Sequence, residues 1–287
     1  MKYLAIDADN WCWRSAHVFA DLSHGEETTG VLFGFLRDLT VAQRKWSPDR
    51  VAFCFDTGRS LRERAYPNYK AARRSVPTDE AMAEEQDQRK DAVRRQILAL
   101  KGRYLPGLGY HNVFAAKGYE ADDLLARVAL AMKRDDELVI CSSDRDLYQL
   151  LTPNVSIWNG RKEITFQSFH KDWGIVPGLW ADVKAIAGCK SDGIVGVRGI
   201  GEKTAAKYLR GDLKAGKKLD VILAGEEIWE SNLPLVRLPY SGCPSTRLVD
   251  DELSPRAWRE LCREKGLDHL IDKCPIRDRG PRGLEIQ

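Results

Sequence analysis

The chain has 287 residues, of which 43% are hydrophobic and 30% charged, and its formal net charge is +3. This length suits one large domain or two closely packed ones with a sizeable core. No apolar run approaches the roughly 18 residues of a membrane span, the N-terminus has no secretory-signal pattern, and the seven cysteines include no Cys-x-x-Cys pair. These features argue against a membrane protein, a disulfide framework and a zinc knuckle, and predict a protein of the reducing cytoplasm.

Three short apolar runs end at or near an aspartate. Tyr3–Ile6 stops at Asp7, Val51–Phe55 stops at Asp56, and Leu138–Cys141 runs through two serines to Asp144. Near-continuous apolar runs predict strands buried on both faces, as in a parallel sheet covered by helices. Ligands of such sheets bind beyond the carboxyl ends of the strands. The sequence therefore predicts an α/β fold that brings several carboxylates to one edge of its sheet.

The remaining expected elements follow in chain order. Helices are predicted over 30–45, 121–132 and 147–151, and a strand over 155–158. The stretch 77–100 favours helix but has few apolar residues in its first half, which indicates a helix that projects from the globule. Beyond a boundary near residue 174, short helices joined by glycine turns are expected, with further helices near 220–223 and 257–265 and a mobile tail from 278.

A basic segment follows the second predicted strand. One acid, Glu63, stands among six cations: Arg59, Arg62, Arg64, Lys70, Arg73 and Arg74. A solvated basic surface is the simplest interpretation of such a run. Here Tyr66 and Tyr69 are interleaved with the cations, a pattern that suits single-stranded nucleic acid because bases stack on aromatic rings while phosphates are neutralised.

Further acids cluster around the predicted third strand. Glu120, Asp122 and Asp123 stand at a helix start, and Asp146 follows Asp144 by two residues. A single aspartate after a strand is more often a turn or capping residue than a ligand. Together these side chains form an all-oxygen set without a local histidine, which favours Mg²⁺ or Mn²⁺ over zinc. Two such ions about 4 Å apart support in-line displacement at a phosphodiester.

A glycine-rich segment, 196–206, precedes an alanine-rich helix. Gly199-Ile200-Gly201 fits a hairpin between two helices, in which small residues and a helix N-terminus approach a phosphate. Arg198, Lys203 and Lys207 add positive charge. The pattern indicates sequence-independent duplex binding, and a purely structural turn is the alternative.

In combination, these motifs resemble the 5′-nuclease family: bacteriophage 5′–3′ exonucleases, the 5′-nuclease domain of bacterial DNA polymerase I, and flap endonucleases. The resemblance covers roughly residues 1–240, in the family's order. Besides the glycine hairpin, it is carried by Ile6-Asp7-Ala8-Asp9-Asn10 with Arg14, Phe55-Asp56 through Arg62, Tyr66 through Arg73, Gly118 through Asp123, and Ser143-Asp144-Arg145-Asp146-Leu147. It implies a PIN-like α/β nuclease core over 1–174 with a central, mostly parallel sheet flanked by helices, a helical arch over about 60–105, and over 175–287 a helix–three-turn–helix DNA-binding region with C-terminal helices.

The resemblance also implies roles for individual residues. The first metal would be held by Asp7, Asp56, Glu120, Asp122 and Asp123, and the second by Asp144, Asp146 and Asp192. Lys70 and Arg73 would engage the scissile phosphate, so that the catalytic set is Lys70, Arg73, Asp122 and Asp144. Tyr69 would stack on a terminal base, and the wider substrate-binding set is Arg62, Tyr69, Arg74, Arg198, Gly199, Gly201, Lys203 and Thr204. The implied cofactors are two Mg²⁺ or Mn²⁺ ions, with a K⁺ ion at the hairpin.

One position departs from the family pattern. In Gly188-Cys189-Lys190-Ser191-Asp192-Gly193, Cys189 replaces a carboxylate of the second metal. A thiol is a poor magnesium ligand, so a weaker or manganese-preferring second site is expected. Asp9, which replaces a small neutral residue of the family, is a candidate for partial compensation.

The expected function is that of a metal-dependent, structure-selective 5′-nuclease, both 5′–3′ exonuclease and flap endonuclease, in replication or repair. Its partner would be DNA with a 5′ flap, a nick or a free 5′ end. RNA primers or RNA/DNA hybrids stay open as substrates. A monomer in a bacterial or phage-infected cytoplasm is expected. Two alternatives remain: a junction-binding relative in which Cys189 marks weakened catalysis, and a PIN-type ribonuclease.

Overall fold

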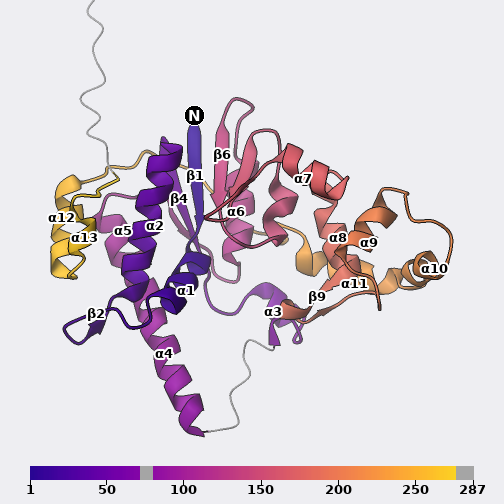
Figure 1. Ribbon diagram of the computed structural model, residues 1–287, viewed down its shortest axis with the longest axis horizontal. Coiled ribbons are helices and arrows are strands. Elements are labelled where there is room, and N and C mark those ends of the chain that lie inside the picture. The colour runs from indigo at the N-terminus through magenta and orange to yellow at the C-terminus, as the bar shows by residue number, and fades with distance from the viewer. Residues whose placement is uncertain (72–79, 276–287) are drawn as a thin grey trace, which may run out of the picture.

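A six-stranded sheet forms the centre of the molecule, in a computed structural model that describes residues 1–71 and 80–275 (Figure 1). Its strand order is β5-β4-β1-β6-β7-β8, and only β8 is antiparallel to its neighbour. The strands are β1 (Lys2–Asp7), β4 (Arg50–Phe55), β5 (Val113–Ala115), β6 (Glu137–Cys141), β7 (Val155–Trp158) and β8 (Glu163–Ile164). The mostly parallel sheet expected from the apolar runs is confirmed, and all four predicted strands belong to it.

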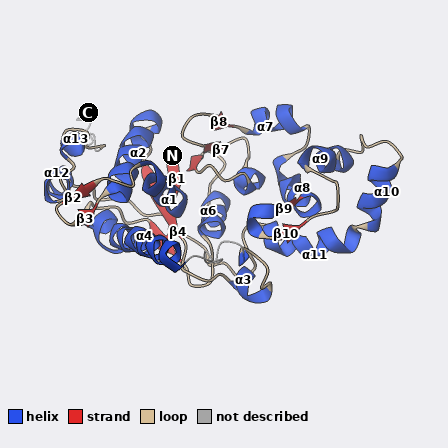
Figure 2. Ribbon diagram, turned by 60° about the horizontal axis from the view of Figure 1, so that its bottom comes forward, coloured by secondary structure: helices blue, strands red, loops and turns tan. Residues whose placement is uncertain are grey.

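Helices cover both faces of this sheet (Figure 2). Alternate residues of the central strand β1 point to opposite sides, as the pleat requires. Leu4 and Ile6 join one apolar cluster with the first two helices, and Ala5 joins a second cluster with α6. The helices up to residue 174 are α1 (Ala8–Val18), α2 (Gly30–Trp46), α3 (Leu61–Ala65), α4 (Glu80–Ala99), α5 (Leu105–Gly107), α6 (Ala121–Leu130) and α7 (Phe166–Trp173), with the short helical turns η2 (Leu100–Tyr104) and η3 (Asp146–Leu150).

The segment beyond residue 174 begins with a helical unit beside β6 and β7. It contains η4 (Pro177–Leu179), α8 (Trp180–Ala187), η5 (Lys190–Asp192), α9 (Glu202–Leu209), α10 (Lys217–Ala224) and α11 (Glu226–Val236), with the short strands β9 (Gly188–Cys189) and β10 (Ile194–Val195). One apolar cluster runs from Leu125 through Phe169 and Trp180 to Val197. The domain boundary near 174 stays a prediction, since the core is continuous across it.

The C-terminal helices take a different place from the one expected. We expected α12 (Pro255–Glu264) and α13 (Asp268–Ile271) to accompany the DNA-binding region, but they lie at the opposite end of the molecule from α8–α11 (Figures 1 and 2). Trp258 and Leu261 are buried in the same cluster as α2. The segment that leads to α12 is held in place by Asp251, whose carboxylate accepts the backbone N–H groups of Val51 (3.2 Å) and His111 (2.9 Å). The last helices therefore complete the nuclease core.

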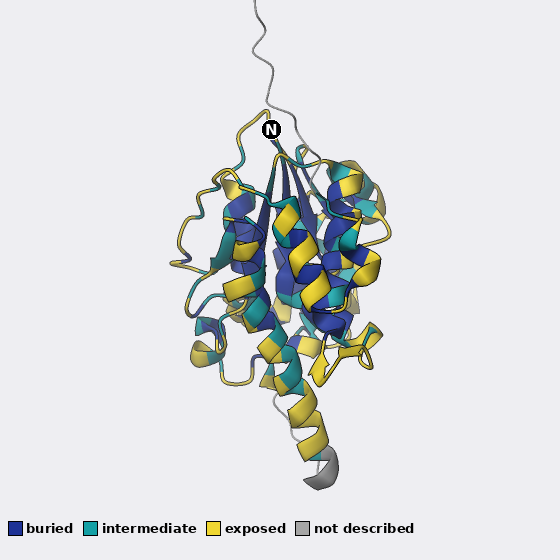
Figure 3. Cartoon of the chain, turned by 90° about the vertical axis from the view of Figure 1, so that its left-hand side faces the viewer, coloured by how far each residue is buried: buried dark blue, intermediate teal, exposed yellow. Residues whose placement is uncertain are grey.

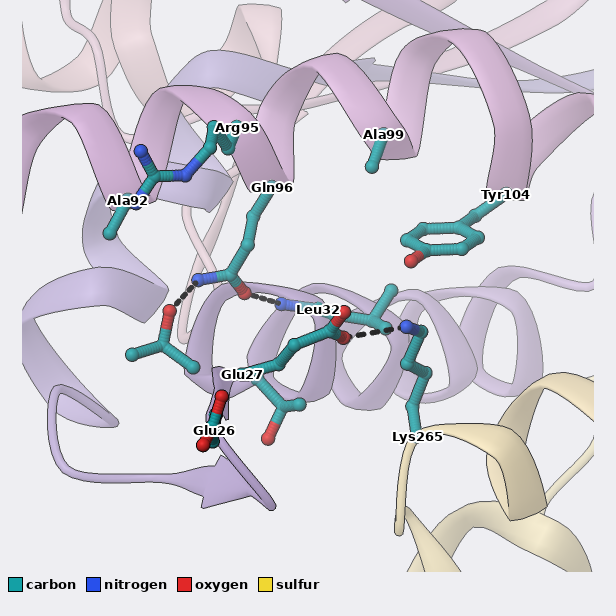
Figure 4. Close-up of a pocket in the computed structure, with 11 residues that line it drawn as sticks. Glu26, Glu27, Leu32, Ala92, Arg95, Gln96, Ala99, Tyr104 and Lys265 are labelled. Atoms are coloured by element: carbon teal, nitrogen blue, oxygen red, sulfur yellow. Dashed lines mark hydrogen bonds and ion pairs between the residues drawn. The ribbon is translucent and has the colours of Figure 1, made fainter.

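The helix α4 projects from the globule, as its composition predicts (Figure 3). Its base is fixed on two sides around a pocket of about 340 Å³ (Figure 4). The Gln96 amide accepts the Leu32 N–H (3.2 Å) and donates to Thr28 (3.1 Å) on the hairpin of β2 (Ser23–His24) and β3 (Glu27–Thr28). Lys265, from the C-terminal helices, forms a 2.7 Å ion pair with Glu27. Part of the arch predicted over 60–105 lies outside the described residues.

Within residues 1–71 and 80–275, no helix combines the length and the apolar character needed to cross a membrane.

Candidate metal centre and nucleic-acid interface

Hydrogen bonds from backbone N–H groups hold the first acids of the candidate site close together. Asp7 ends β1 and caps α1, since its carboxylate accepts the Asn10 N–H (3.1 Å) and the Ser142 hydroxyl (2.7 Å). Asp56, directly after β4, accepts the N–H of Ala121 at the start of α6 (2.7 Å). Its own N–H donates to Asp9 (2.7 Å). The sheet edge and the start of α6 thus bring these carboxylates together, as the sequence pattern predicts.

Burial and the charges of neighbouring acids raise the pKa values of Asp7, Asp9 and Asp122. Burial raises the pKa of Asp7 to about 7 against the opposing hydrogen bonds from Ser142 and Asn10, and the charges of Asp56 and Asp144 add to the rise. Burial and the charge of Asp56 likewise raise the pKa of Asp9 to about 7. The pKa of Asp122 lies well above its ordinary value because of burial and the charges of Asp144 and Asp7. Such mutual destabilisation of the ionised forms is relieved by a cation placed among them.

Two lysines already stand among the acids. Lys70 Nζ lies 2.9 Å from Glu120, and Lys184 Nζ lies 2.8 Å from Asp146. Among residues 1–71 and 80–275, no group of three or more His, Cys, Asp or Glu side chains lies in a metal-binding arrangement. The donor set nevertheless fits a hard divalent cation in its chemistry, because it is made of carboxylate oxygens, and because burial and neighbouring charges oppose the ionisation of Asp7, Asp9 and Asp122. The sequence pattern does not single out Lys184, whose one local signal is the apolar stretch Ala185–Ala187 that follows it.

Lys70 is held in place by its backbone. Its φ of +53° lies in the left-handed region, which non-glycine residues rarely adopt outside functional or strained positions. The Lys70 N–H donates to the Asp192 carbonyl oxygen (2.7 Å). Gly193 allows this approach, since a Cβ there would lie 2.4 Å from the Asn68 carbonyl oxygen. Burial opposes the charge of Lys70, but Tyr69, Glu120 and Asp122 raise its pKa above the ordinary value, so it stays cationic at neutral pH.

Arg62 and Asp123 depart from their expected roles. They are 1% and 0% exposed, and the guanidinium bonds both carboxylate oxygens of Asp123, at 2.7 and 2.8 Å. Asp123 also accepts the backbone N–H groups of Glu120 (3.1 Å) and Tyr240 (2.7 Å). A carboxylate with four such bonds is a structural ion-pair partner. We therefore correct both assignments: Arg62 is closed off from a substrate, and Asp123 from a metal.

Tyr69 also differs from its expected role in stacking on a base. Its side chain is 5% exposed and packs among Ala181, Ala185 and Val236. Its hydroxyl donates to Glu120 (3.1 Å). The hydroxyl therefore helps to hold Glu120 in place. The ring has no face open to a base, because an apolar cluster covers it. Arg73 and Arg74 lie outside the described residues.

The second group of acids surrounds the loop after β6. Asp144 accepts the Asp146 N–H (2.8 Å), and Asp192 is 6% exposed. Cys189 donates its S–H to the Asp192 carboxylate at 3.3 Å and lies 3.0 Å from the Ser191 hydroxyl. Burial raises the pKa of the Cys189 thiol, which the Ser191 hydrogen bond only partly opposes, so the group is a neutral thiol at pH 7. This is consistent with the expected weakness of the second cation position.

The glycine hairpin presents an open surface. Gly199 has φ +76°, which favours glycine, and a Cβ at Gly199 or Gly201 would meet nothing within 4 Å. Arg198, Lys203 and Lys207 are exposed around this turn, with Thr204 half-buried. Lys203 Nζ lies 4.3 Å from the centroid of the Trp173 ring. Exposed cations beside a bare backbone at the start of α9 form a surface suited to phosphate groups.

The geometry agrees with the comparisons to known proteins. The family model of the 5′-3′ exonuclease N-terminal resolvase-like domain matches residues 2–174. The chain belongs to this family. The 5′-3′ exonuclease of Bacillus subtilis (strain 168) is 35% identical over 193 residues, which are 65% of this chain and 60% of that protein. The thermostable DNA polymerase I of Thermus aquaticus is 36% identical over 222 residues, 75% of this chain and 24% of that protein. The chain thus spans less than two thirds of either relative.

The fold of this 5′-3′ exonuclease family member is shared with a solved structure. The bacteriophage T5 D15 flap endonuclease, in a pseudo-enzyme-product complex with DNA and metal ions, matches with a TM-score of 0.64 at 20% identity. The match covers 95% of this chain and 97% of that one. The PIN-like nuclease architecture expected from the sequence is confirmed.

Proposed function

We propose that this protein is a metal-dependent, structure-selective 5′-nuclease that hydrolyses phosphodiesters of DNA near junctions of single and double strands, as a 5′–3′ exonuclease and flap endonuclease. The observation that carries the proposal is the edge of the sheet, where carboxylates from β1, β4, α6 and the loop after β6 converge, and where burial and neighbouring charges raise the pKa values of Asp7, Asp9 and Asp122. Family membership supports it. So do the names of two relatives, a 5′-3′ exonuclease and a flap endonuclease with bound DNA and metal ions.

The carboxylates fall into two groups around the proposed cations. Asp7, Asp56, Glu120 and Asp122 would hold the first Mg²⁺ or Mn²⁺ ion, and Asp144, Asp146 and Asp192 the second, with Asp9 as an added neighbour of the first group. When bound, such ions lower the pKa of water and neutralise charge on the phosphate. The carbonyl groups of the glycine hairpin would take a K⁺ ion.

The chain's own residues position the substrate. The Lys70 ammonium, held beside Glu120, would stabilise negative charge that develops on the scissile phosphate. Its fixed backbone means that little reorganisation is needed when the phosphate arrives. Arg198, Lys203 and the turn at Gly199 and Gly201 would bind the backbone of the duplex. Because these contacts are electrostatic, affinity should depend steeply on salt and little on sequence.

A groove suited to the single strand begins one helical turn from the acids. Asp9 and Trp13 lie on the same face of α1. Trp13, His17, Phe19, Arg89 and Lys90 line a groove of about 590 Å³ between α1 and α4. Aromatic rings and cations in one groove are the combination that single-stranded nucleic acid requires. The groove supports a 5′ strand that passes the acids and continues beneath α4.

The decisive experiment is cleavage of a 5′-labelled DNA flap in Mg²⁺ and in Mn²⁺. The double variant Asp122→Asn/Asp144→Asn should lose cleavage while it still binds the flap. Asp135→Asn/Asp272→Asn removes two exposed acids far from the site and is the matched control, which should cleave normally. Substantial turnover by the first variant would refute the metal assignment.

One observation favours a second candidate, a junction-binding protein with weakened catalysis. Cys189 is a neutral thiol that donates to Asp192 where the family has a carboxylate. Tight binding of the flap without cleavage in either metal would support that candidate. Preferential cleavage of an RNA hairpin would instead support a ribonuclease. A monomer acting in the cytoplasm, on DNA or on RNA/DNA hybrids, completes the proposal.

A further inference from the structure

An ion-pair network joins the loop after β6 to the first residue of the hairpin helix α9. Arg145, which stands between Asp144 and Asp146, donates to the Glu202 carboxylate (2.5 Å). Lys184 Nζ lies 2.8 Å from Asp146 and 3.6 Å from Glu202. Glu202 directly follows the Gly199-Ile200-Gly201 turn. Two cations therefore bridge the proposed metal ligands and the proposed duplex-binding element.

Aromatic rings hold this network in place. The Arg145 guanidinium lies 5.5 Å from the ring centroids of both Trp173 and Trp180. These two rings pack edge to face, with centroids 4.6 Å apart. Trp180 is fully buried and starts α8, the helix that carries Lys184. A guanidinium between aromatic faces and a carboxylate has little rotational freedom, so the position of Glu202 is transmitted to the loop that carries Asp144 and Asp146.

The balance of charge gives Glu202 a specific role. Around the loop, Asp146 and Glu202 share the cation Lys184, and Glu202 also pairs with Arg145, which stands between Asp144 and Asp146 in the chain. Glu202 pairs with both cations and partly neutralises their positive charge. The aspartates therefore keep a net negative charge, which attracts an incoming cation. Without Glu202, Lys184 would neutralise Asp146 alone and Arg145 would lose its carboxylate partner. The cluster would then attract a divalent ion less strongly.

We propose that Glu202 is a positioning residue: through Arg145 and Lys184 it orients the loop of Asp144 and Asp146 and sustains cation binding there, so that the duplex-binding hairpin and the metal site act as one unit. The expected effect of Glu202 on cleavage rests on the proposed function. The expected effect on cation affinity does not depend on that function.

The test compares Glu202→Gln with Glu226→Gln, which removes the exposed first residue of another helix, α11, and serves as the matched control. In Glu202→Gln, the Mn²⁺ concentration for half-maximal flap cleavage should rise about tenfold, the order expected when one nearby unit charge leaves a half-buried site. The dissociation constant for the flap in Ca²⁺ should change less than about twofold, because Arg198 and Lys203 remain. Glu202→Asp should recover part of the loss.

One further measurement separates the possible failures. Calorimetric titration of Mn²⁺ without DNA should show the same loss of affinity in Glu202→Gln, whether or not the wild-type protein cleaves. Wild-type protein that binds Mn²⁺ but cleaves nothing would overturn the proposed function alone. Equal Mn²⁺ affinity in both glutamine variants would overturn the inference. It would also fall if Glu202→Gln lost flap affinity in proportion to rate, since Glu202 would then act in DNA binding.

Discussion

Asp7 offers a prediction in which stability and function change in opposite directions. Its carboxyl is 5% exposed, and burial with neighbouring acids raises its pKa from the ordinary 3.8 to about 7. The folded protein therefore binds this proton more tightly than the unfolded chain does. The stability of the metal-free protein should then fall as the pH rises from about 4 to about 7, because the native state must give up a proton that the unfolded state has already lost.

The magnitude follows from the size of the rise. At about 1.4 kcal/mol per pKa unit, a change from 3.8 to about 7 corresponds to about 4 kcal/mol of lost stability at pH 8. This is an upper limit, because Asp9 and Asp122, whose pKa values are also raised, share the charge of the cluster with Asp7. Asp7→Asn removes the charge. Its amide can still accept the Asn10 N–H and donate to the Ser142 hydroxyl, the two groups that now bond the carboxylate.

Urea denaturation of metal-free protein at pH 5 and pH 8 measures this effect. Asp7→Asn should raise the free energy of unfolding at pH 8 by roughly 2–4 kcal/mol, raise it by less than about 2 kcal/mol at pH 5, and abolish both cleavage and stabilisation by Mn²⁺. Asp136→Asn is the control of opposite sign. Its carboxylate bonds the N-terminal ammonium and the Lys133 N–H, each at 3.0 Å, so its loss should destabilise the protein. Equal destabilisation by Asp7→Asn at both pH values would refute the reasoning.

Four other changes have defined outcomes. Lys70→Met should slow flap cleavage by about 10²–10³-fold with little loss of duplex affinity, measured by single-turnover kinetics; an unchanged rate would remove Lys70 from the site. Arg62→Met should cost about 3–5 kcal/mol of stability in urea denaturation because it leaves Asp123 charged and buried, and Arg62→Met/Asp123→Leu should recover much of it; no recovery would show that packing dominates. Arg198→Ala/Lys203→Ala should weaken flap binding and lower the slope of log affinity against log salt by about 2, whereas an unchanged slope would place the duplex elsewhere. Cys189→Asp should raise the Mg²⁺-supported rate relative to the Mn²⁺-supported rate, and a fall in both would contradict the account of Cys189.

The sheet and the acid-lined edge could be predicted because both depend on local sequence signals. Apolar runs that end at Asp7 and Asp56 determine strands, and parallel strands place their carboxyl ends together whatever the loops do. The projecting helix α4 and the short strand β7 follow from composition and periodicity in the same way. Even the environment of Asp9, beside Asp7 and Asp56, was accessible from its spacing.

Long-range pairing could not be predicted in this way. Arg62 stands in a basic, polar segment that reads as surface, and only the fold shows that it enters the core to meet Asp123 from 61 residues away. Tyr69 reads as an exposed aromatic for the same reason, but α8 and α11 cover it. The return of α12 and α13 to the nuclease core depends on Asp251 and on Trp258, which carry no signal of their distant partners.

The central claim is that acids from β1, β4, α6 and the loop after β6 converge on divalent cations. Anomalous diffraction from crystals soaked in Mn²⁺ tests it directly. The account predicts density within about 2.5 Å of carboxylate oxygens of Asp7, Asp56, Asp122 or Asp144, and its loss in Asp122→Asn/Asp144→Asn crystals. Full occupancy by Mn²⁺ elsewhere on the protein, with these oxygens bonded only to Lys70, Lys184 and the backbone, would contradict it.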